Sequence, residues 1–213
     1  YAAVVLTRNS FDLDGDGVID TWTGGRGFMV QNRVLLTACH TLYHTGYNVW
    51  ATEYRVYKQY ASSIAPENTS TTYYLPQQWV YNPSFLAAHN AKDDWCVIQM
   101  QHSIGAQTGY FGCSVPVNRV SYSSIIVSGY PDYSPYRYYQ YKSTGTAILN
   151  GTDFLYYDAS TLGGVSGGPV FSASDYTVWA INAYEDSTFV VIGGPNYGPR
   201  INSTIIAAIS NLS

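Results

Sequence analysis

Three short segments of the chain contain the residue types that nucleophilic catalysis requires. They are T-A-C-H, which ends at His40, D-W-C-V-I, which begins at Asp94, and G-V-S-G-G-P around Ser166. A serine hydroxyl is a weak nucleophile at its ordinary pKa, so it needs a neighbouring base that takes its proton. The base in turn needs a buried carboxylate, which fixes its tautomer and stabilises its charged form. The segments therefore predict Ser166 as nucleophile, His40 as general base and Asp94 as the orienting carboxylate.

The candidate base, His40, is distinguished by what precedes it. It closes the apolar run V-L-L-T-A-C-H, so a strand that ends in a turn of small residues would present the imidazole at the strand end. The alternative is a structural histidine whose hydrogen bonds are satisfied within the protein. The histidines without such a preceding run are His44, His89 and His102.

Two adjacent aspartates could supply the carboxylate. The stretch Trp95–Met100 is predicted to be a buried strand, and the acid is expected at its immediate start. This favours Asp94 and leaves Asp93 toward solvent. Because successive side chains of an extended segment point in opposite directions, a slip of one residue would instead turn Asp93 toward His40.

Glycines flank the candidate nucleophile on both sides. They permit a tight turn with unusual dihedral angles, and they leave backbone N–H groups free to point at one spot. We expect the N–H groups of Gly164 and Ser166 to form an oxyanion hole, which would stabilise the charge that develops on a carbonyl oxygen during acyl transfer. An ordinary glycine-rich turn is the alternative interpretation.

Size and composition indicate a globular protein with a substantial core. The chain has 213 residues, of which 46% are hydrophobic and 11% are charged, and its formal net charge is −4. A nucleic-acid-binding protein would show a basic patch or stripe. A membrane-spanning helix would need about 18 or more consecutive apolar residues, and no such run occurs. We therefore expect neither a nucleic-acid nor a membrane partner.

Two features favour a secreted protein. The chain begins at Tyr1 rather than Met, as expected of a mature form that has lost a signal or pro-segment. It also contains several N-x-S/T sequons, each of which is weak evidence alone because such triplets are frequent in a chain rich in serine and threonine. The sequons lie at Asn68, Asn150, Asn202 and Asn211.

The cysteines are Cys39, Cys96 and Cys113, an odd number that allows one internal disulfide at most. If His40 contacts Asp94, then Cys39 and Cys96 must lie near each other, and a bridge between them is one prediction. Other pairings exist, and nearness alone does not ensure the geometry that a disulfide requires. The alternative is that all of them are small buried apolar side chains.

Short apolar runs bounded by turn residues dominate the chain and predict strands. Val, Ile, Tyr and Phe are frequent in these runs, and Gly, Pro, Asn, Asp or Ser separate them, which is typical of an all-β sandwich or barrel. The only substantial helix is expected at Ser203–Leu212, where isoleucine and leucine recur near helical spacing, with Asn202 or Ser203 as its N-cap. The expected strands are Ala2–Leu6, Gly27–Val30, Val34–Thr37, Trp95–Met100, Ser124–Gly129, Gly168–Phe171, Val178–Ala183 and Phe189–Ile192.

A second chemical signature lies near the N-terminus, in the segment F-D-L-D-G-D-G-V-I-D. Oxygen-bearing residues at alternate positions suit Ca²⁺, a hard cation that takes about six to eight oxygen ligands. The pattern D-x-D-x-D-G-x-I-D is fairly specific for a calcium loop. The candidate ligands are the carboxylates of Asp12, Asp14, Asp16 and Asp20 and the backbone carbonyl of Val18.

The loop departs from the standard calcium-binding pattern at its end. Thr23 stands where a bidentate Glu is expected, so affinity should be lower or a ligand must come from elsewhere. Four carboxylates in nine residues repel one another without a cation, so we expect a structural Ca²⁺ that stiffens a hairpin between the first two strands. The alternative is an ordinary turn, which Asp and Gly also favour.

Several motifs give the chain a close, nearly full-length resemblance to a known family. The order His, Asp, Ser is that of the chymotrypsin-type arrangement. The chain contains the segments Y-D-A-S-T-L-G-G-V-S-G-G-P-V-F (Tyr157–Phe171), T-G-Y-F-G (Thr108–Gly112), V-S-G-Y-P (Val127–Pro131), V-W-A-I-N-A-Y (Val178–Tyr184) and G-P-R-I-N (Gly198–Asn202). In these segments, and most specifically in the first, which holds the nucleophile, it resembles the glutamyl endopeptidase family within the chymotrypsin-like serine proteases.

The resemblance implies an all-β fold of two six-stranded antiparallel barrels with a C-terminal α-helix. Residues 1–112 would form the barrel that carries His40 and Asp94, and residues 113–213 the barrel that carries Ser166. The implied activity is hydrolysis of polypeptide substrates through an acyl-enzyme by a secreted monomer. The rival interpretations are a non-catalytic binding module that keeps the protease fold, and an esterase that uses the same triad.

Departures from the family concern specificity more than chemistry. Thr161 matches the family's Ser or Thr that contacts an acidic P1 side chain, which is the residue before the scissile bond. Asn182 stands where the family has a histidine that is the main recogniser of that acid. A neutral amide hydrogen bond is weaker than a charged one, so P1 is predicted to be Glu, Asp or another polar residue. Val165 replaces an Asn of the family and should leave activity intact.

Overall fold

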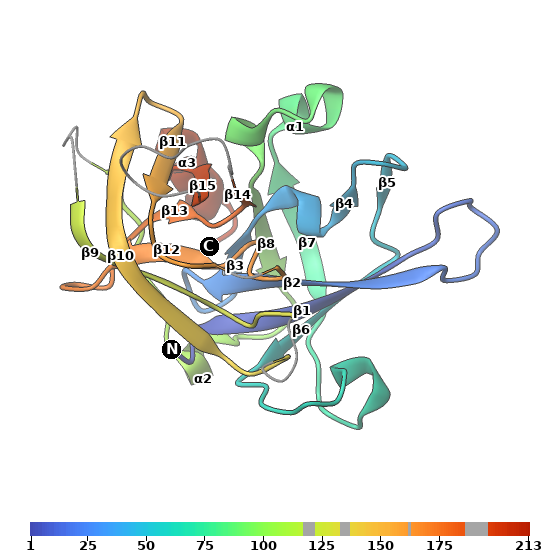
Figure 1. Cartoon of the computed structure of the whole chain (residues 1–213). Coiled ribbons are helices and arrows are strands. Elements are labelled where there is room, and N and C mark those ends of the chain that lie inside the picture. Colours follow the sequence, from blue (N-terminus) through green and yellow to red (C-terminus); the bar gives the residue numbers. More distant parts are fainter. Residues whose placement is uncertain (117–121, 133–136, 162, 186–195) are drawn as a thin grey trace.

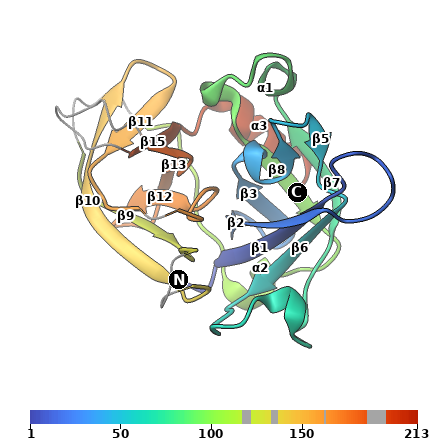
Figure 2. The same cartoon turned by 45° about the vertical axis from the view of Figure 1, so that its right-hand side comes forward.

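The computed structural model describes residues 1–116, 122–132, 137–161, 163–185 and 196–213. Two antiparallel sheets make up most of the molecule, and a short hairpin of β4 (Tyr43–His44) and β5 (Val49–Trp50) stands beside the first. Figure 2 shows the strands of the two sheets on opposite sides, with β1 to β8 forming one group and β9 to β15 the other.

The first sheet has six strands in the order β6-β1-β2-β3-β8-β7. Its central strands are buried: every residue of β1 and β3 is buried, including the polar segment Thr7–Ser10 of β1, whereas β7 is exposed along most of its length. Figure 1 shows the loop between β1 and β2 projecting away from the sheets. The strands are β1 (Val4–Phe11), β2 (Thr21–Met29), β3 (Val34–Thr37), β6 (Glu53–Lys58), β7 (Pro76–Tyr81) and β8 (Cys96–Met100).

The second sheet has seven strands among the described residues, in the order β13-β12-β9-β10-β11-β15-β14. The resemblance implied six, and the additional member is the two-residue strand β14, which pairs with β15 through Tyr184 and Tyr197. The strands are β9 (Tyr122–Gly129), β10 (Tyr141–Asn150), β11 (Phe154–Tyr157), β12 (Pro169–Ser172), β13 (Val178–Ile181), β14 (Tyr184–Glu185) and β15 (Asn196–Pro199).

The predicted C-terminal helix is confirmed as α3 (Ser203–Asn211). Its N-cap is Asn202, whose side-chain oxygen accepts a hydrogen bond of 3.0 Å from the Ile205 N–H. Two shorter helices, α1 (Pro83–Ala88) and α2 (Gly105–Thr108), were not predicted. The signal for α1 is the pair Asn-Pro at its start, an N-cap followed by a proline at the first helical position. No helix of the described residues is long and apolar enough to cross a membrane.

Most apolar runs form strands as predicted, and the all-β prediction is confirmed. The predicted strand Phe189–Ile192 lies outside the described residues. The strands that were not predicted include β6, β7, β10 and β11, in which Tyr, Gln, Lys and Thr are frequent. β6 and β11 bury only some of their residues, whereas β7 is partly or fully exposed along its whole length, so none of them is a continuous buried apolar run.

Two apolar clusters fill the interior. The larger extends from the first sheet to Phe171, Ile181 and the inner face of α3, and the smaller lies within the second sheet around Leu155 and Tyr157. The larger cluster therefore contains residues of both sheets and joins them. The first sheet ends at Met100 and the second begins at Tyr122, and the domain boundary between residues 112 and 113 stays a prediction.

Candidate active site

His40 and Asp94 are in direct contact. The Nδ1 atom of His40 lies 2.6 Å from Oδ2 of Asp94, and the His40 backbone N–H donates to Oδ1 over 2.8 Å. The pairing of β3 with β8 brings them together, because Thr37 is opposite Cys96 and each catalytic candidate lies just beyond that pair. His40 stands in a single 3-10 turn, η1 (Cys39–Thr41), which aims its ring back toward the start of β8.

The neighbouring aspartate, Asp93, makes different hydrogen bonds. The carboxylate of Asp93 accepts hydrogen bonds from Asn82 Nδ2 (2.7 Å) and Ser84 Oγ (2.6 Å), so it anchors the start of α1. Asp93 closes the 3-10 turn η3 (Ala91–Asp93), after which the chain reverses the direction of the next side chain. The structure therefore brings Asp94, and not Asp93, to His40.

A tyrosine that the sequence did not mark completes the surroundings of Asp94. The Tyr184 hydroxyl donates to Asp94 Oδ2 over 2.6 Å, although the two residues are 90 positions apart. Tyr184 belongs to β14 of the second sheet, whereas Asp94 precedes β8 of the first. No local pattern could indicate this contact, because it depends on how the two sheets pack.

The pKa values of Asp94 and His40 follow from their burial and from the hydrogen bonds that they make. Asp94 is 0% exposed, and burial by itself would raise the pKa of its carboxyl group. The charge of His40 and the hydrogen bonds from His40 and Tyr184 outweigh burial, and the pKa is lowered. Burial would lower the pKa of His40, but the charge and hydrogen bond of Asp94 raise it overall. The pair thus holds a carboxylate beside an imidazole that is a stronger base than usual.

Ser166 is held by the backbone on both sides. Its carbonyl accepts a hydrogen bond from the Arg26 N–H, and the Gly167 N–H donates to the Asn182 carbonyl, each over 2.8 Å. Gly164 and Gly167 have φ angles of +88° and +86°, which side-chain-bearing residues rarely adopt. A Cβ atom at Gly167 would also overlap the Arg26 carbonyl oxygen, so this segment requires glycine there.

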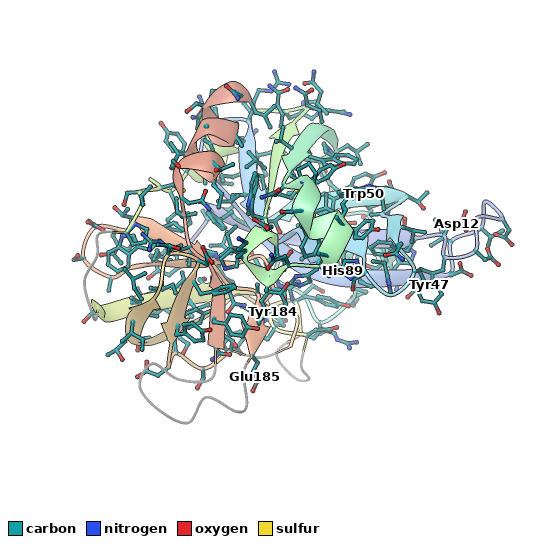
Figure 3. The ribbon with its side chains drawn as sticks, turned by 90° about the horizontal axis from the view of Figure 1, so that it is seen from above. Asp12, Tyr47, Trp50, His89, Tyr184 and Glu185 are labelled. Carbon is teal, nitrogen blue, oxygen red and sulfur yellow. The ribbon has the colours of Figure 1, made fainter. Side chains whose placement is uncertain are left out.

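Ser166, His40 and Gly164 line one open cleft of about 590 Å³. Aromatic rings form much of its wall, and Phe11 and Thr23 of the β1–β2 hairpin close one side. In Figure 3 the labelled Tyr184 and His89 lie near the centre of the molecule, in contrast to the distant Asp12. The aromatic and histidine residues that line the cleft are Phe11, His40, Tyr43, His44, Phe85, His89 and Tyr184.

A buried cation that sequence reasoning missed lies behind the nucleophile segment. Arg26 is fully buried, and its Nη1 donates to the Gly25 carbonyl, while Nε and Nη2 have no hydrogen-bond partner among the described residues. Burial lowers the pKa of this guanidinium to about 9, against the opposing effect of the Asp132 charge. A Cβ atom at Gly164 would lie 3.4 Å from Nη2, so the cation stands close to the expected oxyanion site.

The candidate P1 residues are tied to neighbouring strands. Thr161 Oγ1 donates to Asn196 Oδ1 over 2.7 Å, and the Tyr157 hydroxyl donates to Asn182 Oδ1 over 2.5 Å. Tyr157 and Asn196 are cross-strand partners in β11 and β15, so both candidates attach to the same strand pair. Thr161 lines a second pocket, of about 290 Å³, and Asn182 is buried.

The predicted calcium loop projects from the end of the β1–β2 hairpin (Figure 1). Asp12, Asp14 and Asp20 each offer an oxygen within 4.8 Å of the others, whereas Asp16 is not in this group and its Oδ1 accepts from the Val18 N–H over 2.8 Å. Asp12 accepts from the backbone N–H groups of the loop glycines over 2.7 and 2.9 Å. Three carboxylates on an exposed loop are a donor set that fits a hard divalent cation.

All three cysteines are free thiols, so the predicted Cys39–Cys96 bridge is absent and the alternative of small buried side chains applies to both. A hydrogen bond with Cys96, followed by burial, raises the pKa of the Cys39 thiol. Cys113 is only half-buried, and burial raises the pKa of its thiol to about 12.

The chain is similar to known peptidases in sequence and in fold. The family model for the trypsin-like peptidase domain matches residues 25–181. Glutamyl endopeptidase of Bacillus licheniformis is 28% identical over 191 residues, which cover 87% of this chain and 58% of that protein. Among solved structures, a Glu endopeptidase superposes with a TM-score of 0.76 at 18% identity, over 99% of this chain and 90% of the other. The protease Anisep of Arthrobacter nicotinovorans gives 0.75 at 20%, over 99% and 95%. These likenesses confirm the predicted chymotrypsin-like fold.

Proposed function

Because the chain belongs to the family of trypsin-like peptidase domains, we propose that it is a serine endopeptidase that uses Ser166, His40 and Asp94. The observation that carries the proposal is the contact of 2.6 Å between His40 Nδ1 and the buried Asp94 carboxylate, with Ser166 lining the same cleft as His40. A buried carboxylate bound to one imidazole nitrogen leaves the other nitrogen as the proton acceptor.

The proposed reaction has two halves. Ser166 Oγ attacks the scissile carbonyl while His40 Nε2 takes the hydroxyl proton, and the resulting oxyanion accepts hydrogen bonds from the N–H groups of Gly164 and Ser166. The C–N bond then breaks as His40 returns the proton to the leaving amine, which leaves an acyl-enzyme. Water attacks the ester in the second half, again with His40 as base, and releases the carboxylic acid and free Ser166.

The proposed P1 preference is for Glu, Asp or another polar residue. Its support is the similarity to a protein named glutamyl endopeptidase, together with Thr161 and Asn182 at the positions that the family uses for an acidic side chain. Asn182 donates without a charge, so it should select Glu less strictly than a histidine would. Asn182→His should raise cleavage after Glu in a mixed peptide library, and an unchanged P1 profile would count against this assignment.

We also propose a structural Ca²⁺ on Asp12, Asp14 and Asp20, with Asp16 and the Val18 carbonyl as the further ligands expected from the loop pattern. Its role would be to neutralise repelling carboxylates and stiffen the hairpin whose base, at Phe11 and Thr23, borders the cleft. Secretion, glycosylation at the sequons and a monomeric state are further parts of the proposal. Mass analysis of the protein purified from its culture medium would test secretion and glycosylation together.

The test of the activity is the comparison of wild type with Ser166→Ala. Wild type should cleave a peptide library and form a covalent adduct with a serine-reactive phosphonate, and the variant should do neither while keeping its melting temperature. Normal hydrolysis by Ser166→Ala would overturn the assignment of the nucleophile. Absence of both cleavage and labelling in wild type would favour the binding module. Hydrolysis of simple esters but not of peptides by wild type would favour the esterase.

A further inference from the structure

The carboxylate of Asp94 has more hydrogen-bond donors than the histidine alone supplies. Oδ1 accepts from the His40 backbone, and Oδ2 accepts from both the His40 ring and the Tyr184 hydroxyl, each of the two over 2.6 Å. A fully buried carboxylate is costly unless such donors satisfy its lone pairs. The Tyr184 hydroxyl, which belongs to the second sheet, therefore helps to keep Asp94 charged.

Tyr184 is held in place by a stack of rings across three strands. Its ring stacks on Tyr197 with centroids 5.2 Å apart and planes at 23°, and Tyr197 stacks on Tyr156 at 5.2 Å and 20°. The strand register explains the stack, because Tyr197 of β15 lies opposite Tyr184 of β14 and opposite Tyr156 of β11. Its ring is also 5.8 Å from the ring of His40, tilted by 43°.

No neighbour in the chain could replace this donor. Ala183, which precedes Tyr184 and also lines the cleft, has no hydroxyl, and Glu185 would bring a like charge toward the carboxylate. The phenol is long enough to reach Asp94 from the edge strand β14, and its position is set by the stack rather than by the cleft. A hydroxyl held in this way can restrain the carboxylate from the wall of the cleft.

We propose that Tyr184 is a positioning residue for the catalytic group, which acts by holding Asp94 Oδ2 so that the carboxylate orients His40. The inference rests on the proposed function, since it assigns a task within the same triad. On this proposal the second sheet supplies a hydrogen bond to Asp94 as well as the segment that carries Ser166. Correct packing of the two sheets is then required to orient the acid and to place the nucleophile.

The hydrogen bond has an electrostatic consequence with a defined sign. A donor to Oδ2 withdraws negative charge from the carboxylate and weakens its attraction for a protonated His40. Removing the hydroxyl should therefore raise the pKa of His40 further. Among the described residues, the thiol of Cys39 on η1 also acts on this cluster. A hydrogen bond with Cys96 and burial raise the pKa of that thiol, so it is uncharged near neutral pH.

The matched variants are Tyr184→Phe and Tyr197→Phe, each of which removes one hydroxyl from the stack and keeps the ring. In Tyr184→Phe, kcat/KM on the plateau should fall about fivefold, and its acid limb should move up by about half a pH unit or more. In Tyr197→Phe the acid limb should stay where it is. Near-UV circular dichroism and melting curves would establish that both variants are folded.

A second measurement does not depend on turnover. NMR titration of the His40 ring, with Ser166→Ala in every sample to prevent self-digestion, should show a higher His40 pKa when Tyr184 is also changed to Phe. An unchanged pKa and acid limb, or an equal shift from Tyr197→Phe, would overturn the positioning role. If wild type hydrolyses no peptide, the proposed function fails, while this titration still decides whether Tyr184 acts on the His40–Asp94 pair.

Discussion

Carboxylates gather in two regions of this molecule, the catalytic cleft and the loop between β1 and β2. In the cleft, Asp94 is fully buried and receives hydrogen bonds from two side chains and a backbone N–H. In the loop, Asp12, Asp14 and Asp20 lie within 4.8 Å of one another on an outlying turn, partly or fully exposed. In the cleft, hydrogen bonds from the protein keep the carboxylate charged. In the loop, the carboxylates repel one another, and a bound cation would relieve that repulsion.

Burial decides whether solvent or the surrounding protein controls the electrostatic environment of a carboxylate. Solvent and salt screen the loop carboxylates, so their energetics should respond to the solution, above all to divalent cations. The environment of Asp94 consists of protein donors alone, so it should respond to mutation and to the titration of His40.

Removal of the buried charge should have the greatest effect. Asp94→Asn should lower kcat/KM by about 10⁴-fold, because an amide at this position favours the wrong tautomer of the base. Steady-state kinetics on a peptide substrate would measure the loss. Asp93→Asn is the matched control, since that carboxylate anchors α1 and does not contact His40. Comparable losses in both variants would contradict the assignment.

Two glycines with the same φ angle of +86° allow the two regions to be compared directly. Gly167→Ala adds a clash with the Arg26 carbonyl to the backbone strain, whereas Gly17 has nothing within 4 Å of a new Cβ atom. Gly167→Ala should therefore cost about 3 kcal/mol or more of unfolding free energy. Gly17→Ala should cost only about 1 kcal/mol. Denaturant unfolding of both variants would check the ratio, and equal costs would argue against the buried turn.

The pH dependence of activity should reflect the raised pKa of His40. The base must be neutral to accept the Ser166 proton, so kcat/KM should fall as pH drops through this pKa, by about tenfold per pH unit below it. The midpoint should lie above about 6.5, the ordinary histidine value. His89→Gln should show the same limb as wild type, because His89 lines the cleft, while the hydrogen bonds to Asp94 come from His40 and Tyr184. A midpoint at or below the ordinary value would contradict the influence of Asp94.

Removal of calcium should have the smallest effect, and it should be confined to the loop. A chelator should lower the melting temperature by about 3 °C, which corresponds to about 1 kcal/mol in a chain of this length. The Asp14→Asn variant should lose most of this response, while the pH limb of catalysis should not move. An unchanged melting temperature in chelator would argue against the cation site.

Much of the active site could be predicted from local sequence. The apolar run before His40, the strand after Asp94 and the glycines around Ser166 each follow from short-range rules of strand and turn formation. Local patterns missed β10, in which polar residues interrupt the apolar ones, and β11, whose four residues are too few for a clear pattern. The Cys39–Cys96 bridge, which was one of two open interpretations, does not form, because the nearness of the two cysteines could be inferred from the sequence but their bonding geometry could not.

Local sequence thus predicts the all-β class, the C-terminal helix and the candidates for nucleophile, base and acid, because periodicity and turn chemistry act over a few residues. The sequence favours Asp94 over Asp93 but leaves a slip of one residue open, and tertiary packing makes the choice, since Asp94 contacts His40 whereas Asp93 binds Asn82 and Ser84. Tertiary packing alone also placed Tyr184 on Asp94 and Arg26 behind Gly164. These contacts join residues from distant parts of the chain, and their geometry depends on the packing of strands and sheets, which no local pattern records.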